Sequence, residues 1–429
     1  MKNYKYIKLF AILILKILII TIYLNNRIIK NPFLPEKNED KKQKYYKLQL
    51  NLNHIRYNFQ ELYKKRKIYT INYSYFPYKK INKLISYDKN AENIYNSTGM
   101  LNITLLNYYY NNTNIINSFN LDHIHLSMGL DNKYISLSSI SIASILNTSN
   151  ENTFIHFHIL CINFIFEDMK KIIQLNRINK NVEFIFYNAK QVEYDFGERA
   201  IKEWRGIGEY TRLLVPEIVN NTKKILILDS GDIIAQKDIS EIYFYDIEDN
   251  YFSWILENVA GNNKVQWSKI VNNNFYPNGG VCLVNVREFR KDNLYKKAFF
   301  TSKAYRNLPC PVQDIFLMIS NYKFKFMPLK YNCRPFFYTN EEKKIKNSSL
   351  IKTWMEKQAY SPFKYSKEEI VEAALDPVIS HIIENKLQFS DNCNDNLLIQ
   401  WIQYAKLSGL YEMIKKKYPK PFKCENNLK

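Results

Sequence analysis

The stretch Lys224-Ile-Leu-Ile-Leu-Asp229-Ser-Gly-Asp232 places two acidic residues directly after a short aliphatic run. An unbroken aliphatic run before a turn is typical of a strand buried on both faces of a parallel sheet. Ligands of such sheets bind beyond the carboxyl ends of the strands, where carboxylates can hold a divalent cation that clamps a diphosphate. Gly231 allows a sharp turn between the two acids. An ordinary Asp-Ser-Gly-Asp turn without a metal ion explains the same residues, so the rest of the chain has to distinguish the two.

The residues upstream of this stretch alternate between strand and helix patterns. Apolar runs of strand type and segments with apolar residues at helical spacing follow one another from residue 121 onward. This order predicts an α/β fold, with a Rossmann-like, mostly parallel sheet flanked by helices. The expected strands are 123–128, 154–160 and 182–186, and the expected helices are 134–146, 166–176 and 209–219.

Three segments downstream carry further candidate site residues. Tyr276-Pro-Asn-Gly-Gly-Val combines an Asn-Gly-Gly turn with the start of a second buried strand, where a ligand can approach the backbone closely. Cys310-Pro-Val-Gln-Asp places Gln313 and Asp314 at a helix start, a position at which Asp caps well. His381 follows an apolar pair and suits two interpretations, the third ligand of an Asp/Asp/His metal site or a buried histidine with ordinary partners.

The composition excludes several classes of protein. The chain has 429 residues, of which 46% are hydrophobic, so it can bury a core and is not disordered throughout. Ten glycines and six cysteines exclude collagen and a disulfide scaffold. The net charge of +20 comes from dispersed lysines and arginines without a nucleic-acid-binding motif, which indicates a solvated surface and no nucleic-acid partner. Most of the glycines lie between residues 197 and 280, which points to a site there that needs backbone freedom.

The histidines and cysteines show no metal-binding spacing. Four histidines lie inside expected strands, where alternation indicates packing or surface positions rather than metal ligands; they are His123, His125, His156 and His158. The absence of a Cys-x-x-Cys pair argues against a structural zinc site. Two cysteines in apolar runs are expected to be buried thiols, and the other four are able to pair in an oxidising lumen. The first two are Cys161 and Cys282, and the others are Cys310, Cys333, Cys393 and Cys424.

The N-terminal residues have the pattern of a membrane anchor. Residues 9–25 are apolar except for Lys16 and a few polar positions, and tyrosines on the N-terminal side can lengthen the span toward the roughly 20 residues that a bilayer needs. A cleavable signal peptide is the main alternative, but no small-x-small cleavage site follows. We expect a cytoplasmic tail at 1–8, a signal anchor at 9–25 and a stem at 26–120. This single-pass type II arrangement would place the remainder on the lumenal face of the Golgi or endoplasmic reticulum.

Taken in order, these pieces resemble the family-eight retaining glycosyltransferases, the group of glycogenin and the bacterial lipopolysaccharide galactosyltransferases. The resemblance covers roughly residues 121–390 and implies a GT-A domain there, followed by a C-terminal extension at 391–429. Six motifs follow one another in the family's order. They are Tyr210-Thr-Arg-Leu-Leu-Val-Pro-Glu, the stretch 224–232, Asp238-Ile-Ser-Glu-Ile, Asn278-Gly-Gly-Val, Gln313-Asp314 and Met327-Pro-Leu-Lys-Tyr-Asn332.

The resemblance also implies roles for individual residues. Asp229, Asp232 and His381 would hold the metal ion, Mn²⁺ or Mg²⁺, and Gln313 would be the catalytic residue that faces the anomeric carbon. The donor would be a nucleotide sugar, usually UDP-linked, and the acceptor a glycan or glycoprotein. Four further residues would bind the donor: Asp131 at the base, Arg212 nearby, Asn278 beside the transferred sugar, and Lys386 at the diphosphate.

Three departures from the family's pattern bear on activity. Ser230 and Gly231 put two residues between the acids, where the family has one. Val312 replaces the acid that precedes the glutamine, and the family's His-x-x-Gly-x-x-Lys-Pro-Trp ending lacks its glycine after His381. A catalytically inactive, membrane-tethered sugar-binding protein is therefore the main alternative. A metal-dependent phosphatase with Asp229 as its nucleophile is a further one.

Overall fold

The computed structural model describes residues 121–427, apart from several internal segments. These segments are 163–165, 190–191, 193–194, 197–206, 220–221, 257–275, 306–307, 309, 335–350, 353–354, 357–363, 383–386 and 394. The expected tail, anchor and stem therefore lie outside the described residues, as does Lys386. In the part of the chain that is described, no helix is both long and apolar enough to cross a membrane.

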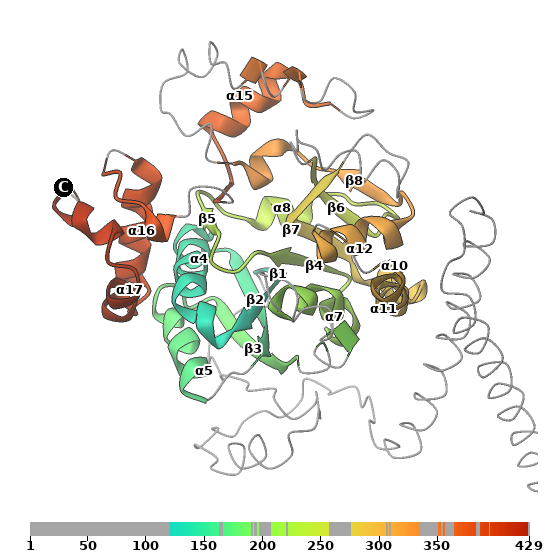
Figure 1. The fold of residues 1–429 in the computed structure, drawn as a ribbon, viewed down its shortest axis with the longest axis horizontal. Coiled ribbons are helices and arrows are strands. Elements are labelled where there is room, and N and C mark those ends of the chain that lie inside the picture. The colour runs from blue at the N-terminus through green and yellow to red at the C-terminus, as the bar shows by residue number, and fades with distance from the viewer. Residues whose placement is uncertain are drawn as a thin grey trace, which may run out of the picture. The chain divides into compact units, whose positions relative to one another are not determined.

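A seven-stranded sheet forms the centre of the described fold (Figure 1). Its order is β3-β2-β1-β4-β7-β6-β8, and β7 is the strand that runs antiparallel to its neighbours. In that order the strands are β3 (Val182–Asn188), β2 (Thr153–Ile162), β1 (Asp122–Asp131), β4 (Lys224–Leu228), β7 (Pro277–Asn285), β6 (Phe252–Leu256) and β8 (Phe324–Phe326). The mostly parallel α/β sheet expected from the sequence is confirmed.

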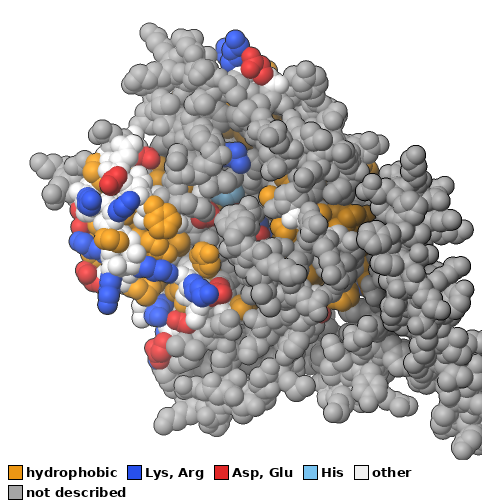
Figure 2. All heavy atoms as spheres, viewed as in Figure 1, with side chains coloured by type: hydrophobic (Ala, Val, Ile, Leu, Met, Phe, Trp, Pro, Cys, Tyr) orange, Lys and Arg blue, Asp and Glu red, His pale blue; other side chains and the backbone are white. Residues whose placement is uncertain are grey.

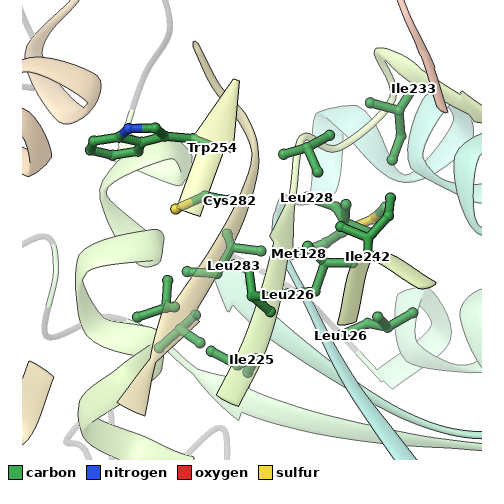
Figure 3. Packing of buried hydrophobic residues seen from close by; sticks show 14 of the residues in the cluster. Leu126, Met128, Ile225, Leu226, Leu228, Ile233, Ile242, Trp254, Cys282 and Leu283 are labelled. Carbon is green, nitrogen blue, oxygen red and sulfur yellow. The ribbon is translucent and has the colours of Figure 1, made fainter. Parts of the chain in front are cut away.

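The central strands are hydrophobic on both faces. Every residue of β2 is buried, and in β4 the aliphatic run from Ile225 to Leu228 is buried as well. Leu226 of β4 pairs with Leu283 of β7, and both belong to a core cluster that also contains Trp254 of β6 (Figure 3). Burying one large apolar side chain contributes about 1.5–3 kcal/mol. The core therefore fixes the strand register on which the position of every site residue depends.

Helices cover the sheet in two groups. The helices α7, α10, α11 and α12 contact one another, and α10 and α12 also contact β7, whereas α4 contacts α5 and α16 (Figure 1). The expected helices at 134–146, 166–176 and 209–219 correspond to α4 (Ile135–Thr148), α5 (Phe166–Ile173) and α7 (Thr211–Ile218). The others are α8 (Ser240–Phe244), α10 (Val286–Lys291), α11 (Leu294–Ala304), α12 (Pro311–Ser320), α15 (Lys367–Leu375), α16 (Asn396–Leu407) and α17 (Tyr411–Lys417).

The residues after 390 form a helical unit that packs on α4. Trp401 of α16 and Leu137 of α4 belong to the same hydrophobic cluster, and the disulfide Cys393–Cys424 ties the ends of the unit together. The remaining four cysteines are free thiols. Of the four expected to be able to pair, two therefore do and two do not. Cys161 and Cys282 are buried as expected, and burial raises the pKa of Cys282 to about 12.

A small second sheet brings a distant segment to the end of β4. Strand β5 (Ile233–Ala235) follows the acidic turn directly and pairs antiparallel with β9 (Ile379–His381). Ile233 lies opposite His381 in this pairing, and the N–H of Ile382 donates to the carbonyl oxygen of Asp232 over 2.6 Å. This pairing carries His381 to the acidic turn, although the two are far apart in the sequence.

Candidate active site

The acidic turn after β4 depends on Gly231. Its φ of +86° lies in the left-handed region that side chains rarely adopt. A Cβ at this position would lie 2.7 Å from the Cβ of Leu137 in α4, which is closer than real Cβ contacts. The expectation that Gly231 lets the chain turn between the two acids is confirmed. Asp229 and Asp232 are both half-buried at the carboxyl end of β4.

Asp229 is held from three sides. Its backbone N–H donates to the carbonyl oxygen of Gly280 in β7 over 2.8 Å. Its Oδ1 forms an ion pair with the guanidinium of Arg212 from α7, and its Oδ2 lies 3.1 Å from Nε2 of His381. Arg212 is fixed in turn because it donates to the carbonyl oxygen of Gly279 over 2.8 Å. The carboxylate therefore lies between a permanent cation and an imidazole.

His381 belongs to a buried polar row that consists of Asn278, Asn332 and His381 itself. Nδ1 of His381 lies 2.8 Å from Oδ1 of Asn332, and Nδ2 of Asn332 donates to Oδ1 of Asn278 over 2.8 Å. The same oxygen of Asn278 accepts the N–H of Gly280 over 2.9 Å. The three residues are 5%, 1% and 3% exposed, so water competes little with these hydrogen bonds.

The glycines of the Asn278-Gly279-Gly280 segment lie inside β7. The expected tight turn at the strand start is therefore wrong, because the strand already begins at Pro277. Gly280 is required for close approach instead. A Cβ there would lie 2.0 Å from Cε1 of His381 and 2.8 Å from Oδ2 of Asp229. Gly280 thus leaves the space in which the imidazole and the carboxylate meet.

Gln313 reaches the same strand from α12. Its Oε1 accepts the N–H of Gly279 over 2.8 Å, while Arg212 donates to the carbonyl oxygen of that glycine. The side chains of α7 and α12 therefore hold neighbouring peptide groups of β7. An amide oxygen can accept two hydrogen bonds, so this contact orients Gln313 without using its full capacity as an acceptor.

Asp314 anchors α12 but does not cap it in the expected way. The N-cap is Cys310, and the fully buried carboxylate of Asp314 accepts the N–H of Cys310 over 2.8 Å and the hydroxyl of Tyr276. Burial, together with the Asp314 carboxylate, raises the pKa of Tyr276 well above its usual value. Tyr276 directly precedes β7, so this contact ties the strand to the helix that carries Gln313.

Asp131 and Tyr134 lie at the carboxyl end of β1. Asp131 accepts the N–H of Lys133 over 3.0 Å and caps the 3-10 turn η2 (Asn132–Tyr134). Tyr134 is 43% exposed. Partial burial raises the pKa of Tyr134, and the carboxylates of Asp232 and Asp131 add to the shift. Tyr134 is therefore within electrostatic reach of both acids.

The structure brings most of the expected site residues to one edge of the sheet. Figure 2 shows histidine and acidic side chains close together near the centre of the face in view, beside the surface of the C-terminal helices. Direct contacts link Arg212, Asp229, Asn278, Gly279, Gly280, Gln313 and His381. Asp131 ends β1 and Asp232 follows β4, and both strands end at this edge.

Two of the three expected metal ligands, Asp229 and His381, lie together in the structure. A carboxylate oxygen and an imidazole nitrogen face one another there, and Mn²⁺ accepts both kinds of ligand. Asp232 follows in the same turn. Within the described ranges, however, no three side chains of His, Cys, Asp or Glu are close enough together to hold an ion. The structure thus brings Asp229 and His381 together but does not gather the Asp232 carboxylate with them.

Two residues of the site were given no role by the sequence. Asn332 connects His381 to Asn278, and Tyr276 connects β7 to α12 through Asp314. Tyr276 begins the Asn-Gly-Gly segment and Asn332 ends the motif at 327–332. No local signal distinguished them, because a buried amide or hydroxyl needs partners and theirs lie far away in the sequence.

The fold is similar to those of solved glycosyltransferases. The apo structure of the WbbM bifunctional glycosyltransferase matches 70% of this chain and 52% of its own, at 17% identity and a TM-score of 0.53. The galactosyltransferase LgtC, solved with donor and acceptor sugar analogs, matches 67% of this chain and 95% of its own, at 17% identity and a TM-score of 0.51. At these identities the likeness shows the fold, which is that of GT-A glycosyltransferases.

Two curated bacterial proteins are similar in sequence. The lipopolysaccharide 1,2-glucosyltransferase of Escherichia coli is 27% identical over 215 residues, which are 49% of this chain. A putative glycosyltransferase of Haemophilus influenzae is 22% identical over 218 residues, which are 48% of this chain. The match spans 62% of the length of each relative.

The model of the family described as Glycosyl transferase family 8 matches residues 125–353. That range is more than half of the chain, and it contains the acidic turn, Asn278, Gln313 and Asn332. The family expected from the order of the motifs is confirmed. The chain belongs to glycosyl transferase family 8.

Proposed function

We propose that this chain transfers a hexose or a related sugar from a nucleotide sugar to a glycan or glycoprotein acceptor, with retention at the anomeric carbon. The contact of Asp229 with His381 carries the proposal, because it lies at the edge where β7 and Gln313 also converge. The curated relative from E. coli is a glucosyltransferase and LgtC is a galactosyltransferase, which supports a hexosyl donor. The proposed donor is UDP-linked.

Asp131 and Tyr134 are the proposed contacts of the nucleotide base. Asp131 stands at the carboxyl end of β1, where ligands of such sheets bind. Tyr134 presents an exposed ring beside it, and an aromatic face is a stacking surface for a base. A carboxylate that accepts N–H groups and an aromatic ring that stacks are together a suitable pair of contacts for uracil.

The diphosphate is proposed to lie beyond Asp229. When bound, Mn²⁺ or Mg²⁺ supplies positive charge to the departing diphosphate. Asp229, Asp232 and His381 are the residues that would hold the ion. Arg212 keeps the Asp229 carboxylate in one orientation through the ion pair with Oδ1, so that Oδ2 faces His381. Lys386 is proposed from the sequence alone as a further positive charge at the diphosphate.

Gln313 is the proposed catalytic residue. Retention needs either a carboxylate nucleophile or attack by the acceptor on the face that the leaving group vacates. Among the described carboxylates at the site, Asp229 is engaged by Arg212 and His381, and Asp314 is fully buried at the start of α12. Asp131 caps η2, and Asp232 is assigned to the metal ion. None of them is placed as a nucleophile, which favours front-face attack. The amide oxygen of Gln313 then stabilises the oxocarbenium-like centre.

A catalytically inactive sugar-binding protein is the second candidate function. Val312 favours it, because this side chain is 3% exposed and packs in the core at a position where the family has an acid. The spacing of Asp229 and Asp232, with two residues between them where the family has one, also favours this alternative. This alternative predicts that the chain binds a nucleotide sugar without turning it over.

A phosphatase with Asp229 as nucleophile has less support. Both oxygens of the carboxylate have close partners, Arg212 and His381, which restrain the attack that an aspartyl-phosphate mechanism needs. That mechanism predicts a covalent phosphoenzyme and no preference for UDP.

We propose that the chain is a single-pass type II membrane protein with its family-eight domain in the lumen of the Golgi or endoplasmic reticulum. The apolar run at 9–25 supports this assignment, and so do Asn-X-Ser/Thr glycosylation sequons such as those at Asn96 and Asn102. The disulfide Cys393–Cys424 agrees with an oxidising compartment. Protease protection of the C-terminus in intact microsomes, lost on adding detergent, tests this topology.

Melting temperatures of the purified protein, measured against a panel of nucleotide sugars with Mn²⁺, test the donor class. A ligand at about 100 times its dissociation constant stabilises the folded state by about 2.7 kcal/mol. We expect a rise with UDP-sugars and none with GDP- or CMP-sugars. A panel without any rise argues against the proposed function.

A further inference from the structure

The buried polar row contains an amide, that of Asn332, whose two ends contact two different parts of the site. One end meets Asn278 of β7 and the other meets His381 of β9. Asn332 itself belongs to the 3-10 turn η5 (Leu329–Asn332) and is 1% exposed. Because the amide oxygen only accepts and the amide nitrogen only donates, Asn332 requires a donor atom on one neighbour and an acceptor atom on the other. The role inferred below for Asn332 rests on the proposed function.

The orientation of each group in the row follows from one backbone donor. The N–H of Gly280 can only donate, so the atom of Asn278 that it meets at 2.9 Å is the carbonyl oxygen. That oxygen can only accept, so the atom of Asn332 facing it at 2.8 Å is the amide nitrogen. The oxygen of Asn332 therefore faces Nδ1 of His381, and Nδ1 must carry a proton.

The proton on Nδ1 also determines what Nε2 of His381 can do. With the proton on Nδ1, the ring in its neutral form has the lone pair of Nε2 directed at Oδ2 of Asp229, 3.1 Å away. Two acceptors at this distance repel each other unless a positive centre lies between them. A metal-binding histidine needs this same arrangement, with the second nitrogen held by a hydrogen-bond acceptor.

We infer that Asn332 is a positioning residue that keeps His381 in the Nδ1–H form and so aims the Nε2 lone pair at the metal position beside Asp229. The same amide ties that histidine to Asn278, the residue proposed to lie beside the transferred sugar. The Asn332 side chain thereby links His381, the proposed metal ligand, to β7, the strand that carries Asn278.

Two substitutions of Asn332 separate these two contacts. Asn332→Ala removes the acceptor for Nδ1, and we expect Mn²⁺ affinity to fall about 10- to 100-fold, as is typical for residues that support a metal ligand. Asn332→Asp keeps an acceptor for Nδ1, but its second oxygen repels the Asn278 oxygen. We expect it to retain Mn²⁺ affinity to within about 3-fold, since the outer partner survives, and to lose nucleotide-sugar turnover.

The affinities are measured by calorimetric titration of Mn²⁺ into the full chain, with and without UDP. The control is Asn285→Ala, which removes the N-cap of α10 at the other end of β7 and should leave Mn²⁺ affinity unchanged. Folded Asn332→Ala protein with wild-type Mn²⁺ affinity would overturn the inference, and so would a loss of affinity in Asn332→Asp equal to that in Asn332→Ala. A wild-type chain that binds no Mn²⁺ would overturn it as well.

Nitrogen NMR of histidine-labelled wild-type protein covers the case in which Asn332→Ala does not fold. The signals of His381 are assigned by their loss in His381→Gln. A protonated Nδ1 in the metal-free protein supports the inference, and an unprotonated Nδ1 overturns it. Because neither readout depends on sugar transfer, a chain that binds Mn²⁺ but turns over no nucleotide sugar would contradict the proposed function and leave the inference standing.

Discussion

Histidines occur in two contrasting settings in this protein. On β1 and β2, His123, His125, His156 and His158 form a ladder in which the partners of the imidazoles are mainly other imidazoles. The rings of His125 and His156 stack at a centroid distance of 4.4 Å, and Nδ1 of His125 lies 3.0 Å from Nε2 of His158. On β9, by contrast, His381 lies between an amide oxygen and a carboxylate.

The difference shows that burial alone does not decide what a histidine can do, because its neighbours also differ. His158 and His381 are both buried. Burial and the neighbouring imidazoles lower the pKa of His125 to about 2 and that of His158 to about 3, so these two histidines are held neutral. His381 instead faces the Asp229 carboxylate, where a positive centre is favoured. The ladder lies within the sheet, whereas His381 lies at the candidate site.

The largest expected effect distinguishes these two histidines by activity. His381→Gln should lower sugar transfer by on the order of 10²–10³-fold, because the charge on the departing diphosphate loses part of its stabilisation. His158→Gln should lower stability but leave the activity per folded molecule nearly unchanged. The measurement is initial rate normalised to folded protein. Equal activity losses in the two variants would contradict the contrast.

The next effect concerns the space between His381 and Asp229. Gly280→Ala places a methyl group 2.0 Å from Cε1 of His381, so the ring or the strand must move. Misplacement of reacting groups by about 1 Å can cost about 10²-fold in rate. The matched control is Gly208→Ala, because a Cβ there meets nothing within 4 Å. An active Gly280→Ala variant would show that the close approach is not needed.

Acid should lower the stability of the folded protein through His125 and His158. The pKa values of His125 and His158 are far below the value of about 6.5 in an unfolded chain, so the folded state prefers them neutral. The stability that this preference contributes is complete above about pH 6.5 and is lost as the pH falls toward the folded values. At pH 5.5, each of these two histidines should lower the free energy of unfolding by about 1.4 kcal/mol relative to high pH.

Urea denaturation at pH 7.5 and pH 5.5 measures this effect. The variant His158→Gln removes one of the two groups, so its loss of unfolding free energy between the two pH values should be smaller by about 1.4 kcal/mol. If wild type and variant lose the same amount, the ladder is not the source of the acid sensitivity.

The last expected effect comes from the end of the ladder. The hydroxyl of Tyr187 lies 2.9 Å from Nδ1 of His158, and both residues are buried. Tyr187→Phe leaves that nitrogen without this partner and should cost about 1–3 kcal/mol of unfolding free energy. Denaturation midpoints give the stability, and transfer assays should show unchanged activity. A large fall in activity would mean that the ladder and the site are coupled.

The sequence predicted the elements of the fold because each carries its own local pattern. The aliphatic run before Asp229, the alternation around His125 and the helical spacing after Tyr134 depend only on nearby residues, and the structure confirms all three elements. The predicted Asn-Gly-Gly turn was wrong because the glycines there do not reflect a local pattern. Glycine there reflects a side chain from β9 pressing on Gly280, and that contact is not local.

The candidate site was predictable in part. The residue pattern identified Asp229 and His381 as possible metal ligands, and the resemblance added the catalytic role of Gln313. The structure brings all three to one edge of the sheet. Asn332 was not given a role, because its importance lies in two hydrogen bonds to residues far away in the sequence. A single chain shows which side chains are polar but not which of them will be buried opposite one another.

Anomeric configuration and metal dependence, followed together by proton NMR, test most directly whether this site transfers sugar. The purified protein is incubated with an α-linked UDP-hexose and Mn²⁺, alone and with candidate acceptors, and compared with Asp229→Asn. We predict release of UDP with an α-configured product, dependent on Mn²⁺ and lost in the variant. A β-configured product, or UDP release that persists in Asp229→Asn or after chelation of the metal, would contradict the proposed mechanism.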